Sequence, residues 1–203
     1  MIDHIILGCK EIDEGIQFIY QKTSVMPQKG GRHPQWGTQN ALLSLGQNSY
    51  LEVMAPIPGQ ATNYPFDSLP DFSTPKWLTW AARTEDILAV KTTLDAMNMK
   101  HSDIIPGARI KPDGQTLRWK LLFPENNYSG VFPFFIEWES KSLHPVLTSP
   151  IGLSLMTWHL GHPEFSKINA CFIQLKVGLH CTESVQPKLQ GLFQVGQNNA
   201  VWI

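Results

Sequence analysis

The order strand, helix and three further strands recurs along this chain, and the repetition limits the folds that the chain can adopt. The first pass comprises a strand at 3–10, a helix at 11–25, an irregular stretch at 27–39 and a hairpin of strands at 40–46 and 48–56. The second pass comprises a strand at 77–83, a helix at 84–99, a broken stretch at 102–114 and strands at 116–123 and 131–140. Recurring element order indicates internal duplication of a β-α-β-β-β unit.

A third, shorter pass follows the two complete ones. It is predicted from a strand at 153–160, a helix that Pro163 opens, and short strands near 180, 190 and 200. We therefore predict an α+β protein with a first βαβββ module at 1–56, a Pro-rich linker over the surface at 57–75, a second module at 76–140 and a partial third module at 145–203.

Composition excludes several classes of partner. The chain has 203 residues, is 42% hydrophobic and has 16 Lys and Arg against 17 Asp and Glu, without a basic cluster. This balance argues against nucleic acid or an anionic membrane as a partner. The three cysteines form no CxxC pair, and neither a signal peptide nor an apolar run of about 20 residues is visible. We expect a cytoplasmic protein with free thiols.

Two carboxylates stand within strands that otherwise read as buried. Glu52 lies in YLEVMAP and Glu137 in PFFIEWE. Burying an unpaired carboxylate costs several kcal/mol, so each side chain needs a cation, a metal, a hydrogen-bond network or water. One interpretation is that both carboxylates face a cavity. The other is that each is solvated at a sheet edge or paired with an arginine.

Four segments together resemble a known family: DHIILGCKEIDEG, GGRHPQWGTQNALLSLG, YLEVMAP and PFFIEWE. They are similar to the glyoxalase-like domain of the vicinal oxygen chelate superfamily, which includes glyoxalase I, the extradiol dioxygenases and the fosfomycin-resistance proteins. The resemblance covers most of residues 1–180. It implies that βαβββ modules pair, with a curled, cup-shaped mixed sheet and helices on the outside.

The resemblance also implies a metal site with ligands from the first and last strands of each module. Those positions hold His4, Glu52 and Glu137 here, whereas Thr79 stands opposite His4 and is not a normal ligand. An imidazole with two carboxylates suits Fe(II), Mn(II), Ni(II) or Zn(II). A carboxylate not fully engaged with the metal, Glu52 or Glu137, could transfer a proton catalytically. Without a metal, His4 would be an ordinary core or cleft histidine.

A loop beside the predicted cup adds candidate substrate-binding residues. Arg32 and His33 follow a Gly-Gly pair, and Asn40 follows shortly after. A guanidinium and an imidazole there suit recognition of a carboxylate or another anionic group. The alternative is a turn in which Arg32 pairs with Asp or Glu.

Two functions follow from the residues and the resemblance. The first is a metal-dependent lyase, isomerase or dioxygenase acting on a small, anionic or oxygen-rich molecule. The second is a metal-free protein that binds such a molecule without catalysis. The third pass could complete a pair within the chain, cap an open sheet or dock on the second subunit of a homodimer.

Overall fold

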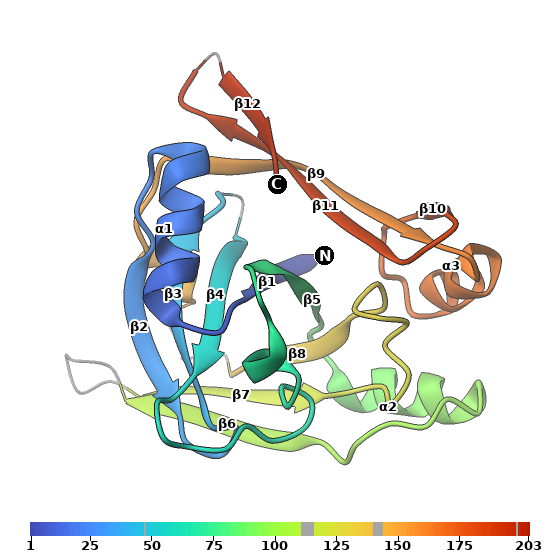
Figure 1. Ribbon diagram of the computed structural model, residues 1–203. Helices are drawn as coiled ribbons and strands as arrows, with labels where there is room; N and C mark the ends of the chain where they lie inside the picture. Colours follow the sequence, from blue (N-terminus) through green and yellow to red (C-terminus); the bar gives the residue numbers. More distant parts are fainter. Residues whose placement is uncertain (47, 111–115, 140–143, 198) are drawn as a thin grey trace. The chain divides into compact units, whose positions relative to one another are not determined.

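The computed structural model describes residues 1–203 except residues 47, 111–115, 140–143 and 198 (Figure 1). The chain divides into two compact units. Unit 1 contains Met1–Asp3, Thr79–His144 and His159–Gln190, and unit 2 contains His4–Leu78, Pro145–Trp158 and Gly191–Ile203. None of the helices in the described parts of the chain is both long enough and apolar enough to cross a membrane.

Unit 2 is built around the first βαβββ module. Its elements are β1 (Ile2–Gly8), α1 (Ile12–Thr23), β2 (Gln28–His33), β3 (Thr38–Ser44) and β4 (Tyr50–Pro56). The strands lie in the order β2-β3-β4-β1, with β4 antiparallel to β3 and parallel to β1. A parallel pair needs a long crossover connection, which α1 and the β2–β3 hairpin supply here.

Helix α1 covers one face of this sheet. Its buried stripe includes Ile12, Ile16 and Ile19, and the helix packs against β3 and β4. A Cβ atom at Gly15 would lie 2.4 Å from Cγ1 of Val53, so the helix approaches β4 too closely for a larger residue. Because successive side chains of a strand point to opposite faces, Val53 marks the helix-covered face and Glu52 the other.

The segment between the modules is partly buried. Phe66, Leu69 and Phe72 are buried, and Leu69 opens the short helix η1 (Leu69–Asp71). A Cβ atom at Gly8 of β1 would lie 2.5 Å from the Phe72 ring, so this ring rests against the strand. The predicted surface path is therefore wrong for these three residues, because apolar side chains at every third position anchor the segment despite its prolines. The module boundaries themselves stay predictions.

The C-terminal part of unit 2 joins the same core. It contains η2 (Pro145–Leu147), the first residues of β9 (Leu153–His162), the end of β11 (Lys188–Val195) and β12 (Asn199–Trp202). Strands β11 and β12 form an antiparallel hairpin. The Trp77 ring stacks on Phe193, and its Nε1 donates to the backbone oxygen of Ile203 at 2.7 Å.

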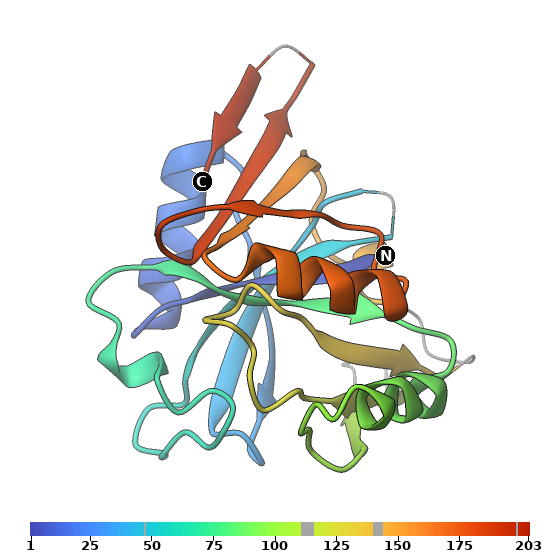
Figure 2. The same cartoon turned by 90° about the vertical axis from the view of Figure 1, so that its right-hand side faces the viewer.

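Unit 1 is built around the second module, whose elements are β5 (Lys76–Arg83), α2 (Ile87–Ala96), β6 (Ile105–Ile110), β7 (Thr116–Leu122) and β8 (Phe134–Trp138). The strands lie in the order β5-β8-β7-β6, which repeats the connectivity of the first module. Helix α2 packs against β7 and β8 (Figure 2, green helix). The predicted α+β class with two βαβββ modules is confirmed.

The third pass contributes α3 (Phe165–Gln174) and β10 (Cys181–Glu183), which pairs in parallel with the end of β9. The helix begins at Phe165, two residues after the predicted start at Pro163. Nδ1 of His162 accepts a 2.9 Å hydrogen bond from the N–H of Glu164, which satisfies that N–H before the helix begins. Phe172 of α3 packs against Trp80 in the core of unit 1.

Candidate functional site

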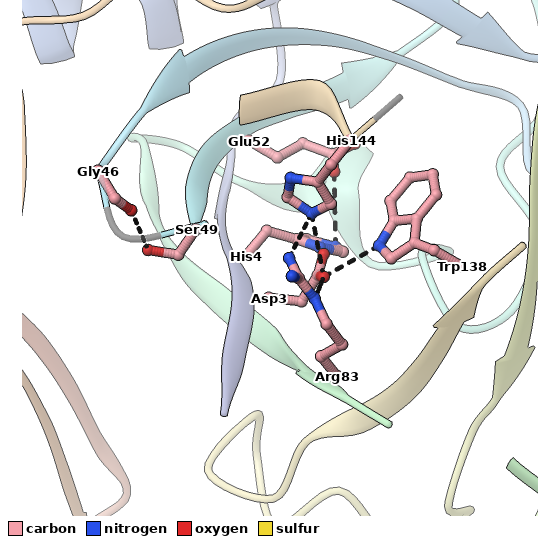
Figure 3. A network of polar contacts seen from close by, with 8 residues as sticks. All are labelled: Asp3, His4, Gly46, Ser49, Glu52, Arg83, Trp138 and His144. Atoms are coloured by element: carbon pink, nitrogen blue, oxygen red, sulfur yellow. Dashed lines mark hydrogen bonds and ion pairs between the residues drawn. The ribbon is translucent and has the colours of Figure 1, made fainter. Parts of the chain in front are cut away.

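The Glu52 carboxylate is buried on the face of β4 that α1 does not cover. Glu52 is 5% exposed, and within the described residues it forms an ion pair with a histidine and not with Lys or Arg. Oε2 of Glu52 lies 3.6 Å from Nε2 of His4 (Figure 3). The positive charge that could balance Glu52 therefore comes from the His4 imidazole, which is charged only when it is protonated.

Strand pairing brings His4 to this carboxylate. In the parallel pair of β1 and β4, His4 lies opposite Tyr50 and Ile6 lies opposite Glu52, so His4 and Glu52 are diagonal neighbours. The His4 ring stacks on the Tyr50 ring with centroids 4.7 Å apart and planes 20° apart. This stacking fixes the plane of the imidazole beside the carboxylate.

Asn40 contacts the other carboxylate oxygen. Its Nδ2 donates a 2.9 Å hydrogen bond to Oε1 of Glu52, and its Oδ1 accepts a 2.8 Å hydrogen bond from the N–H of Gly31. Asn40 is itself 6% exposed. The three side chains His4, Glu52 and Asn40 thus form a buried polar cluster, with one residue from each of β1, β4 and β3.

A β-bulge positions the Gly31 N–H. Lys29 of β2 lies opposite Ala41 of β3, whereas Arg32 lies opposite Gln39, so two glycines face the single residue between them. That single residue is Asn40. Bulges occur next to functional sites, where they redirect a side chain or a backbone group. The Gly-Gly pair that precedes Arg32 therefore forms this bulge.

The other two predicted substrate-binding residues lie on β2, the terminal strand of its sheet order. Arg32 is exposed, and no ion pair is recorded for it among the described residues. Nδ1 of His33 lies 3.4 Å from Oγ1 of Thr38. Their role in substrate binding stays a prediction.

Glu137 has a different environment. Its Oε1 accepts a 2.6 Å hydrogen bond from Nζ of Lys120, and its Oε2 accepts a 2.8 Å hydrogen bond from the N–H of Ile87, the first residue of α2. The hydrogen bond from Lys120 to this carboxylate raises the pKa of the lysine. A carboxylate at a helix N-terminus is also favoured by the helix dipole. Glu137 thus lies on the helix-covered face of β8.

The strand register gives the position in module two that corresponds to Glu52. Ile6 and Ala81 each precede the first residue of their helix by six positions. Ile6 lies opposite Glu52, and Ala81 lies opposite Phe134. Phe134 is therefore the counterpart of Glu52, and Glu137 falls on the other face.

The same comparison shows that the second module lacks the whole polar cluster. Thr79 stands at the position of His4. Because Phe134 corresponds to Glu52, Ile136 corresponds to Met54 two residues later. Asn40 lies opposite Met54, and Leu121 lies opposite Ile136, so a leucine stands in the second module where the first has the asparagine. The polar cluster is thus a feature of the first module alone.

The donor atoms of the cluster fit two ligands of one metal ion. Atoms bound to one ion at ~2.0–2.2 Å, with an angle of roughly 90–120° between the bonds, lie roughly 2.8–3.8 Å apart. The 3.6 Å between His4 and Glu52 falls in this range and is long for a hydrogen bond. Within the described residues, no group of three or more His, Cys, Asp and Glu side chains is arranged to hold a metal. Convergence of Glu137 with His4 and Glu52 stays a prediction, because Glu137 belongs to unit 1 and the other two to unit 2.

A second polar cluster, in unit 1, is not distinguished by the sequence. The Asp3 side chain is fully buried, and its Oδ2 accepts hydrogen bonds from Nε of Arg83 at 2.6 Å and from Nε1 of Trp138 at 3.0 Å (Figure 3). Nε2 of His144 lies 3.2 Å from the same oxygen. The only sequence signal for this cluster is a charged residue at the start of an apolar strand.

Two βαβββ modules of identical connectivity, with a polar cluster on the helix-free face of the first, define the glyoxalase-like class of α+β fold. Residues 2–172 match the family model described as glyoxalase-like domain. The chain therefore belongs to the glyoxalase-like domain family, as the sequence resemblance predicts. No curated protein sequence matches this chain.

One solved structure shares the fold over nearly the whole chain, and two further ones are similar to a smaller part of it. A hypothetical protein from Staphylococcus aureus has a TM-score of 0.66 and 18% identity, and the match covers 99% of this chain and 83% of that chain. Methylmalonyl-CoA epimerase from Mycobacterium tuberculosis has a TM-score of 0.48 and 16% identity, over 68% of this chain and 86% of that chain. A methylmalonyl-CoA epimerase in complex with methylmalonyl-CoA and NH4+ has a TM-score of 0.49 and 18% identity, over 70% and 96%. The first of these likenesses extends over the C-terminal part of the chain as well as both modules.

Proposed function

We propose that the polar cluster of His4, Asn40 and Glu52 is the binding site for a small, anionic or oxygen-rich molecule, and that a divalent metal ion binds there. His4 Nε2 and Glu52 Oε2 would be its ligands from this cluster. The observation that carries the proposal is a buried carboxylate whose recorded charged partner in the described chain is an imidazole 3.6 Å away.

Charge compensation supports a cation at this place. A buried carboxylate without a cationic partner costs several kcal/mol, and one neutral hydrogen bond from Asn40 offsets only part of that cost. A divalent ion between His4 and Glu52 would place a permanent positive charge beside the carboxylate. The remaining coordination positions would be left to oxygen atoms of the bound molecule or to water.

The residues of the chain suit acid–base chemistry on an oxygen-rich ligand. When bound, a divalent metal acts as a Lewis acid on the oxygen atoms that contact it. A Glu52 carboxylate that is not fully engaged with the metal can accept a proton, and the burial of His4 and Glu52 excludes bulk water from them. The exposed guanidinium of Arg32 can pair with an anionic group through two parallel hydrogen bonds. These functions fit a lyase, an isomerase or a dioxygenase.

Metal-free binding is the second candidate. It is favoured by Thr79 at the position that corresponds to His4, and by the lack of a three-ligand group among the described residues. In this case His4 and Glu52 would bind the ligand by hydrogen bonds alone.

Metal titration separates the two candidates. We expect chelator-treated, untagged protein to bind about one equivalent of Mn²⁺, Fe²⁺, Ni²⁺ or Zn²⁺ in calorimetry, and His4→Ala to bind none. His180→Ala, which removes an exposed histidine, is the matched control and should bind as the wild type does. If the wild-type protein binds none of the four ions, the metal-dependent function is excluded and metal-free binding is supported.

A further inference from the structure

We propose that Asn40 is a positioning residue that orients the Glu52 carboxylate and reserves Oε2 for the bound cation, and that Asn40 does not itself contact that cation. This inference rests on the function proposed above. Asn40 is thereby assigned the role of holding the Glu52 carboxylate in place, and the Gly-Gly bulge the role of holding Asn40 in place.

The orientation of the Asn40 amide follows from its two neighbours. The Gly31 N–H can only donate, so the atom 2.8 Å from it must be the amide oxygen. The amide nitrogen then faces Oε1 of Glu52 at 2.9 Å. Reversing the amide would place two donors together at one end and two acceptors together at the other. The bulge therefore determines which way Asn40 points.

The choice of an amide has an electrostatic consequence. A neutral donor stabilises the ionised carboxylate without cancelling its charge, whereas Lys or Arg at this position would neutralise Glu52. Asn40 thus keeps a full negative charge available on a buried side chain. Because Oε1 is held by the amide, Oε2 is the oxygen that lies toward His4.

The second module supports this pairing of roles. Where Phe134 replaces the carboxylate, Leu121 replaces the amide. A residue needed for the sheet itself would be useful in both modules. The amide occurs only in the module that has the acid.

A double-mutant cycle on Zn²⁺ affinity tests the role. Asn40→Leu should weaken Zn²⁺ binding by ~10–100-fold, as loss of a partner that orients a metal ligand typically does. In the Glu52→Gln background the same substitution should have no further effect, because the residue that it orients has lost its charge. Additive losses in the two backgrounds would overturn the proposal.

The isosteric variant Asn40→Asp gives a second test. Two carboxylates 2.9 Å apart must share a proton, so Zn²⁺ affinity should fall by at least about tenfold. A rise in affinity would mean that residue 40 contacts the ion directly. Gln39→Glu is the matched control, since it makes the same chemical change one residue away on the other face of β3, and it should leave affinity within about twofold.

A metal-free readout separates failure of this inference from failure of the proposed function. In wild-type protein without metal, one side-chain amide proton of Asn40 should resonate downfield and exchange slowly with solvent in NMR spectra, and Glu52→Gln should abolish that shift. A shifted amide with no Zn²⁺ binding would contradict the proposed metal function and leave the Asn40–Glu52 relationship standing. An unshifted amide in protein that does bind Zn²⁺ would contradict the positioning role alone.

Discussion

Glu137 accepts a 2.8 Å hydrogen bond from the backbone N–H of Ile87, the residue that begins helix α2. The first four N–H groups of a helix have no partner within it, so this carboxylate satisfies a group that would otherwise lack one. Glu52 has no such helix contact and faces away from α1. Two glutamates that look alike in the sequence therefore stand in different environments.

Glu137→Gln should destabilise unit 1. The substitution removes the charge at the helix N-terminus and the ion pair with Lys120, and we expect the free energy of unfolding to fall by ~1–2 kcal/mol in urea titrations. Glu139→Gln, on the exposed residue two positions later, is the control and should be neutral. We expect Zn²⁺ affinity to stay the same in both variants, and a sharp loss of binding in Glu137→Gln would instead support the metal ligand role that the resemblance implies for Glu137.

Asp3→Asn should be more damaging. The shape is retained, but the Arg83 guanidinium loses its counter-ion at a fully buried position. Removing one partner of a buried pair typically costs 3–5 kcal/mol, and the partial exposure of Arg83 lowers our expectation to about 2–4 kcal/mol. Chemical denaturation measures this loss. A change below about 0.5 kcal/mol would show that the network contributes little.

The Cys9 thiol gives a pH-dependent prediction. Burial raises its pKa from 9.0 to about 12, so the folded protein keeps the proton that the unfolded chain releases. This contribution to stability is present below pH 9 and is lost as the pH rises toward 12. We therefore expect wild-type protein to lose more stability than Cys9→Ala between pH 8 and pH 10.5 in thermal melting. Parallel curves for the two proteins would contradict the raised pKa.

Arg32→Lys tests the predicted anion contact. The charge is kept, but the planar fork that can bind a carboxylate with two hydrogen bonds is lost. We expect affinity for a small dicarboxylate such as malonate to fall several-fold, while the melting temperature stays the same because Arg32 is exposed. Equal malonate affinity in both proteins would leave Arg32 without a role in anion binding.

The order of elements could be predicted from the sequence because hydrophobic periodicity and turn residues are local signals. The face on which each glutamate lies could not. That face depends on the register of β8 against β5 and on where α2 packs, and both are non-local. The Asp3 cluster was missed for the same reason, since its partners lie 80, 135 and 141 residues away. The anchoring of the 57–75 segment depends on contact with Gly8, which is far from that segment in the sequence, so no local pattern predicts it.

His4 and Glu52 were selected from the resemblance together with the cost of burying a carboxylate. The structure places their side chains 3.6 Å apart on one face. Asn40 was selected only as a neighbour of Arg32 and His33. Its contact with Glu52 depends on the β3–β4 register and on the bulge in β2, neither of which the residue types specify.

The most direct measurement pairs Zn²⁺ affinity with the free energy of unfolding in Glu52→Gln, using chelator-treated protein for the unfolding. If Glu52 serves a binding site, Zn²⁺ affinity should fall sharply, while stability stays unchanged or rises by up to ~1–2 kcal/mol, because an unfavourable buried charge has been removed. If Glu52 is only a structural partner of Asn40 and His4, the variant should lose roughly 1–3 kcal/mol and Zn²⁺ binding should match the wild type, which would contradict the proposed site.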